Sequence, residues 1–238
     1  LPNGNILALV WERILFQDAL DNGIKRESDL FAEKIVEINP LTNQIVWQWR
    51  SWEHRIQDQD KNLPNYGDVS LQFGKIDFNY NPKENGDIMH ANGIYYDSNK
   101  DLIYLSVNFY SEVWVIDHSV SNENSSSSLG DLKYRFGNPS AYKTEGERLF
   151  FSNHHPNLVE LDPITKGNFL IFMNGSEDQQ SIVYELKLPY NSFDDDDKLL
   201  LPDVLWSFTN PELFHGKISG AVRLSNGNTL ICEGDFGY

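Results

Sequence analysis

The fold is decided by four short segments between residues 93 and 136: Gly93-Ile94-Tyr95-Tyr96-Asp97, Leu102-Ile103-Tyr104-Leu105-Ser106-Val107-Asn108, Glu112-Val113-Trp114-Val115-Ile116-Asp117 and Leu132-Lys133-Tyr134-Arg135-Phe136. Each segment is rich in β-branched and aromatic residues, and polar or turn-forming residues separate it from the next, which is typical of β-strands. Four such strands in succession predict one antiparallel four-stranded unit.

The same order of strands recurs along the chain, with tight polar turns such as Asn226-Gly227 between the first and second strands. The matching segments are 6–11, 34–39 and 45–49; then 158–162, 169–174, 181–186 and 204–208; then 221–224 and 229–233. Repetition of four-stranded units predicts an all-β fold of the β-propeller type. We expect one domain, with blade one at about residues 1–52, blade two at 87–137, blade three at 153–209 and the start of blade four at 218–238. Blade one lacks its innermost strand.

The insertions between these strands are expected to be irregular. They cover residues 16–30, 52–86, 119–130 and 189–201. The serine run at 125–128 and the aspartate run at 194–197 are interpreted as solvated loop tips rather than calcium or partner sites. We see no helical periodicity of comparable strength.

Composition narrows the possible partners. The 35 acidic against 19 basic residues give a formal net charge of −16, which repels nucleic-acid phosphates and anionic lipid headgroups. The 40% of hydrophobic residues are enough for a sizeable core, but no apolar run of about 18 residues occurs. Neither nucleic acid nor a membrane is therefore expected as a partner, whereas the oligomeric state cannot be predicted.

Polar clusters begin the innermost strands of two neighbouring blades. The first is Asp87-Ile88-Met89-His90-Ala91-Asn92, and the second is Phe151-Ser152-Asn153-His154-His155-Pro156-Asn157. Equivalent positions in adjacent propeller blades face the same central channel. We therefore expect His90 and His155 to meet in one site, although an ordinary hydrogen-bonding role at the blade edges remains the alternative.

The order of these motifs resembles the bacterial-type arylsulfotransferase family. The matching elements are Asp87 with His90 and Asn92, Glu112–Asp117, Phe151–His155, Phe172-Met173-Asn174-Gly175 and Leu224-Ser225-Asn226-Gly227-Asn228. The resemblance implies a six-bladed propeller that transfers a sulfuryl group from an aryl sulfate to a phenolic acceptor through a histidine, without a nucleotide or other cofactor. It also implies an exported protein, periplasmic or secreted.

This resemblance suggests a role for each candidate residue. His155 and His90 are the expected catalytic residues, because a neutral imidazole is a competent nucleophile near pH 7 and a second imidazole can move the phenol proton. Sulfuryl oxygens carry negative charge and need hydrogen-bond donors around them. The expected substrate-binding residues are Asn92, Asn174, His154 and Arg223. The expected partners are therefore small molecules, an aryl sulfate and a phenol.

Three departures from the family pattern keep a second hypothesis open. Asn108, Met173 and Ser219 stand where the family has arginine, aspartate and a histidine-bearing strand start. A binding or scaffold propeller without the family chemistry is therefore the alternative function. Converging imidazoles could also hold zinc or iron, but no His-x-His or Glu-x-x-His spacing supports a metal site. His54 and His118 are expected at the surface.

Overall fold

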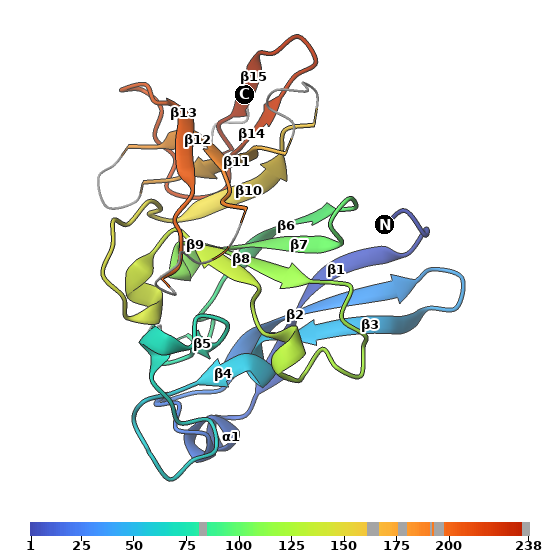
Figure 1. Cartoon of the computed structure of the whole chain (residues 1–238), viewed down its shortest axis with the longest axis vertical. Coiled ribbons are helices and arrows are strands. Elements are labelled where there is room, and N and C mark those ends of the chain that lie inside the picture. The colour runs from blue at the N-terminus through green and yellow to red at the C-terminus, as the bar shows by residue number, and fades with distance from the viewer. Residues whose placement is uncertain (81–84, 161–166, 176–179, 191, 193–197, 235–238) are drawn as a thin grey trace.

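The computed structural model describes residues 1–80, 85–160, 167–175, 180–190, 192 and 198–234. The protein is mostly β, and its antiparallel sheets follow one another in chain order (Figure 1). Among the described residues these sheets do not close into a ring. No helix in the described part of the chain is long and apolar enough to cross a membrane.

The first sheet has three strands, β1 (Ile6–Ile14), β2 (Leu30–Asn39) and β3 (Gln44–Arg50), in the order β1-β2-β3. All three contain the predicted segments. Among the described residues, β1 is an edge strand of this sheet and pairs only with β2. One short helix, α1 (Phe16–Asp21), lies in the insertion that we expected to be irregular.

The second sheet confirms the four strands that decide the fold. It contains β6 (Ala91–Asp97), β7 (Leu102–Val107), β8 (Glu112–Asp117) and β9 (Tyr134–Phe136), paired in chain order and antiparallel throughout. β7 is buried along its whole length, and β8 up to its last residue. Their near-continuous apolar sequences reflect burial of both faces of the strand.

The third sheet contains β10 (Asn153–Leu158), β11 (Phe169–Met173), β12 (Ile182–Lys187) and β13 (Asp203–Phe208), again in chain order. Our placement of its first strand at 158–162 was wrong, because β10 begins at Asn153. The pairing with β11 shifts register between His154 and Asn157, and His155 has a φ of 57°. This bulge accommodates Pro156, which cannot donate to a regular ladder. Residues 161 and 162 lie outside the described part.

The rest of the described chain consists of short elements. A hairpin of β14 (Gly220–Arg223) and β15 (Thr229–Cys232) matches the predicted start of the next repeat, and β4 (Arg55–Ile56) pairs in parallel with β5 (Ile76–Asp77). Single 3-10 turns occur at Ser51–His54, Val69–Leu71, Asn108–Tyr110, Ser128–Gly130 and Pro139–Tyr142. Ser125 is buried, so the serine run is not a wholly solvated tip. The aspartate run lies outside the described residues.

The first strands of successive sheets pack side by side, with β10 between β6 and β14 (Figure 1). The backbones approach closely: a Cβ on Gly93 would lie 2.5 Å from Cδ of Pro156, and a Cβ on Gly220 would lie 2.8 Å from Cγ of His155. Glycine is required at both positions, since real Cβ atoms do not come this near to another atom. The polar segments that begin these strands are thereby brought together.

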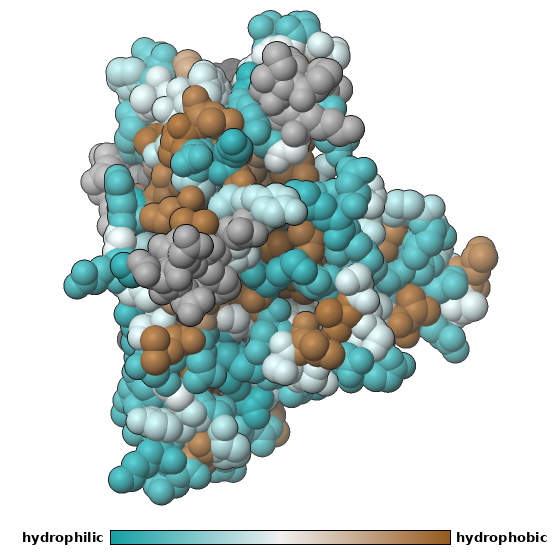
Figure 2. Space-filling view, in the orientation of Figure 1, coloured by the Kyte–Doolittle hydropathy of each residue, from teal (hydrophilic) through white to brown (hydrophobic). Residues whose placement is uncertain are grey.

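Tryptophans join the first two sheets. Trp47 and Trp49 of β3 are buried, and their indole nitrogens donate to the backbone carbonyls of Val120 and Gly130 at 2.9 and 2.8 Å. Trp114 is fully buried in the same core. The face shown in Figure 2 carries many hydrophilic side chains, with apolar side chains in separate groups between them.

Candidate functional site

His90 stands immediately before β6 and is held by Asp87. The carboxylate of Asp87 accepts the His90 backbone N–H at 3.1 Å, and its second oxygen lies 2.5 Å from Nδ1 of His90. The ring also stacks on Phe109, with centroids 4.8 Å apart. Because Nδ1 faces a carboxylate it carries the proton, which leaves Nε2 as the reactive nitrogen. The His90 side chain is 47% exposed, so Nε2 can reach a solute.

His154, in β10, is held by an amide network. Its Nδ1 lies 2.6 Å from Oδ1 of Asn174, whose Nδ2 donates to the carbonyls of His215 and Ile218 at 2.7 and 2.9 Å. These two carbonyl partners fix the orientation of the amide, so its oxygen must face His154. Nδ1 of His154 therefore carries the proton and Nε2 has the free lone pair.

The pKa of His154 is lowered, first by burial and further by the neighbouring charge of His90, against a raising effect from Asn174. A neutral imidazole at pH 7 with a free Nε2 is the state that a nucleophile needs. A charge on His90 therefore lowers the pKa of His154.

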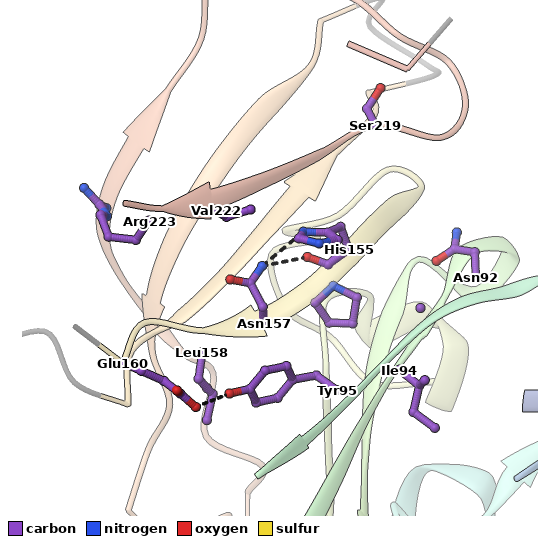
Figure 3. A pocket seen from close by; sticks show the side chains of 12 residues that line it. Asn92, Ile94, Tyr95, His155, Asn157, Leu158, Glu160, Ser219, Val222 and Arg223 are labelled. Atoms are coloured by element: carbon purple, nitrogen blue, oxygen red, sulfur yellow. Dashed lines mark hydrogen bonds between the residues drawn. The ribbon is translucent and has the colours of Figure 1, made fainter. Parts of the chain in front are cut away.

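His155, the next residue, turns toward β14. Its Nδ1 lies 3.0 Å from the carbonyl oxygen of Ala221 and 3.2 Å from Nδ2 of Asn157, so an acceptor and a donor both face this nitrogen. The ring lines a pocket of about 580 Å³ between β6, β10 and β14 (Figure 3). Asn92 lines the same pocket, whereas His90 is not among the lining residues.

The pocket carries polar groups at several points of its wall. Tyr95 donates to a carboxylate oxygen of Glu160 at 2.5 Å, and Figure 3 shows this pair across from His155 and Asn157. Burial, followed by this carboxylate, raises the pKa of the Tyr95 hydroxyl above its usual range. The tyrosine therefore stays protonated at neutral pH. A small aromatic molecule could contact both the imidazole and the phenol–carboxylate pair.

Asn92 joins the two neighbouring sheets. Its Nδ2 donates to the carbonyl of Asn153 at 2.8 Å, and the same carbonyl accepts from Ser106 at 3.1 Å and from Asn108 at 3.3 Å. Asn108, which stands where the family has arginine, is thus part of a buried network. One hydrogen of the Asn92 amide is occupied in this way, and the other is available to a ligand.

Arg223 and Asn174 are both engaged within the protein. Arg223 forms an ion pair with Glu185, donates to the carbonyl of Gly227 at 3.1 Å and lies over the ring of Trp206. Its side chain lines the pocket with its charge already balanced. Asn174 is fully buried, and its amide is used to orient His154.

Two histidines expected at the surface are not there. His54 is fully buried, stacks on Trp49 with ring centroids 5.2 Å apart, and places Nδ1 2.7 Å from Asp131. His118 lies between the carboxylates of Glu37 and Asp101, at 3.0 and 2.7 Å. Our expectation was wrong because the aromatic strands of one sheet cover loops of the next. Neither histidine belongs to the candidate site.

Sequence reasoning missed one acidic residue beside the site. Glu33 of β2 is buried, and its Oε1 accepts from the backbone N–H of Ala91 at 2.8 Å and from the indole of Trp11 at 3.2 Å. The only signal in the sequence was a glutamate inside a strand that is otherwise buried. No described group of three or more His, Cys, Asp and Glu side chains is arranged to hold a metal ion.

Comparison with known proteins gives one family match. A family model described as Arylsulfotransferase (ASST) matches residues 1–187, which contain the first three sheets up to the end of β12. Asp87, His90, His154, His155 and Asn174 all lie within the match. A comparison with curated proteins gave no match.

Proposed function

Because the chain belongs to the arylsulfotransferase family, we propose that it transfers a sulfuryl group from an aryl sulfate to a phenol at the ends of β6 and β10. The observation that carries the proposal is that two imidazoles at the starts of β6 and β10 are each oriented by a hydrogen bond to Nδ1. His154 is held neutral with Nε2 free, and His90 is held by the carboxylate of Asp87.

The reaction follows from these two states. Nε2 of His154 attacks sulfur, the bond from sulfur to the phenolic oxygen breaks, and the departing phenolate takes a proton from Nε2 of protonated His90. A second phenol then gives its proton to His90 and attacks the sulfur, which restores the free imidazole of His154. Asp87 stabilises the imidazolium form of His90 between the two steps.

His155 lies in the pocket beside this pair, and we propose that it contacts the substrate. Its ring lines the pocket and can contact a solute there. Asn92 donates a hydrogen bond to a sulfuryl oxygen. Arg223 contributes to substrate binding at the far side of the pocket. His155 is the alternative nucleophile, because it is more exposed than His154.

The test is acceptor-dependent release of a chromogenic phenol by the full-length protein. We expect His154→Ala to abolish transfer, His90→Ala to lower kcat about a hundredfold or more, and His155→Ala mainly to raise KM. If His155→Ala were inactive and His154→Ala remained active, His155 would be the nucleophile and His154 would contact the substrate. If all three variants kept near-normal turnover, the proposal would fail.

We also propose that the sheets are blades of one closed six-bladed propeller and that the protein is exported to the periplasm or secreted. The side-by-side first strands and the family membership support the first part, and family membership alone supports the second. A structure of the full-length protein would test closure, and fractionation of the producing cells would test location.

A further inference from the structure

Glu33 is a buried carboxyl group that the proposed reaction does not use. It lies on β2 and has no exposed surface. Both of its hydrogen bonds go to Oε1, from the N–H of Ala91 and the indole of Trp11. Oε2 is buried and has no hydrogen-bond partner among the described residues. A buried carboxylate oxygen without a hydrogen-bond partner is energetically costly, which points to a specific function for Glu33.

The contacts of Glu33 lead to the Asp87–His90 pair. Ala91, which donates to Glu33, directly follows His90 and begins β6. Phe31, two residues before Glu33, forms a parallel bridge with Asp87, and its N–H donates to Gly86 at 2.9 Å. Strand β2 thus holds the residues on both sides of the pair. His90 itself has a φ of 48°, which is unfavourable for a residue other than glycine and needs such support.

We propose that Glu33 is a positioning residue, whose carboxyl group holds the Asp87–His90 pair in place and whose ionisation sets how strongly His90 keeps its proton. The inference rests on the proposed function only in giving His90 a catalytic role. The positioning itself is a property of the folded protein.

Burial raises the pKa of Glu33 from 4.5 to about 7, and the charge of Asp87 adds to this rise, while Ala91 and Trp11 lower it. The carboxyl group therefore changes charge within the pH range in which an imidazole normally works. Ionised Glu33 places a second negative charge near the pair, which favours the imidazolium form of His90.

Other charged groups around Glu33 are already paired. On the β1 side, Arg13 forms an ion pair with Asp29; along β2, Glu37 accepts from His118. On the β3 side, Ser51 donates to the backbone carbonyl of Glu33 at 2.7 Å and brings no charge. Asp87, whose carboxylate is hydrogen-bonded to His90, is thus the charged group through which Glu33 acts on the pair.

The test is Glu33→Gln in the full-length protein, because the amide keeps an oxygen for Ala91 and Trp11 but cannot ionise. The readout is the rate at which diethyl pyrocarbonate acylates His90, measured by peptide mass mapping across pH. Only the neutral imidazole reacts. We expect the midpoint of this titration to move to lower pH by about half a unit or more in the variant.

Glu37→Gln is the matched control, since it removes a buried carboxylate four residues along the same strand and should leave the His90 titration unchanged. An unchanged midpoint in folded Glu33→Gln overturns the inference. If that variant does not fold, Trp11→Phe removes a bond that favours ionised Glu33, and the same downward shift is expected. A shifted midpoint in a protein that does not transfer sulfuryl groups would reject the proposed function and leave this inference standing.

Discussion

At the scale of single residues, the site depends on which nitrogen of each imidazole carries the proton. His90 and His154 present Nδ1 to an acceptor, a carboxylate and an amide oxygen respectively, whereas Nδ1 of His155 lies near both a carbonyl oxygen and the amide nitrogen of Asn157. His90 and His154 therefore have Nε2 available for chemistry. Their surroundings differ, because His90 is linked to a charge and His154 is kept neutral by burial.

Substitution of Asn174 tests the orientation of the His154 ring. Asn174→Ala removes the acceptor for Nδ1 of His154 and the donor to two carbonyls. We expect turnover to fall about tenfold or more and the free energy of unfolding to fall by about 1–3 kcal/mol. Asn124→Ala, at an exposed loop position, should change neither quantity. Turnover and urea denaturation of both variants are the measurements, and normal turnover in Asn174→Ala would contradict the assigned orientation.

Glu33 and His154 make opposing contributions to the pH dependence of stability. The raised pKa of Glu33 means that the folded state binds the extra proton between pH 4.5 and about 7, so this group makes the protein less stable as pH rises through that window. The lowered pKa of His154 acts in the other direction, since its contribution is complete above pH 6.5 and declines as pH falls below that value.

Glu33→Gln separates these two contributions. Relative to the wild type, the variant should gain up to about 3 kcal/mol in the free energy of unfolding between pH 4.5 and about 7, with no further gain at higher pH. Urea denaturation at several pH values measures the difference. A gap between the two proteins that stays constant with pH would show that Glu33 does not titrate in this range.

At the scale of elements, the close packing of β6, β10 and β14 places the polar segments together. Gly93→Ala tests this packing, because its Cβ would meet the ring of Pro156. We expect a loss of about 1–3 kcal/mol in unfolding free energy, together with reduced turnover. In the comparison variant Gly4→Ala, the new Cβ would meet no other atom, so the loss of stability measures only the cost of the positive φ at this position. An unchanged stability of Gly93→Ala would mean that the two strands can move apart.

The sequence predicted the regular elements better than it predicted the site. Alternation and turn residues are local, so the strands of the second sheet and the hairpin at β14 and β15 could be placed closely. β10 could not, because its bulge, its two histidines and Pro156 give it the composition of a loop. Asn174 binds the backbone of His215, 41 residues away, and Glu33 binds the backbone of Ala91 in the next sheet, 58 residues away. No local pattern reports such contacts.

At the scale of the whole molecule, successive sheets are joined by polar contacts as well as by apolar packing. Indoles of the first sheet bind the loop after β8, Asn92 binds β10, and Asn174 binds the segment before β14. The second and third junctions thereby fix Asn92 and Asn174 of the candidate site. The net negative charge of the chain repels a sulfate ester. Binding of this anion therefore depends on hydrogen-bond donors within the site.

The most direct test of the account is the intact mass of the full-length protein after mixing with an aryl sulfate in the absence of acceptor. We predict an increase equal to one sulfuryl group, located on His154 by peptide mapping and removed when a phenol is added. The same treatment of His154→Ala should give no increase. Acceptor-dependent turnover by a protein that never gains this mass, or that gains it in His154→Ala, would contradict the account.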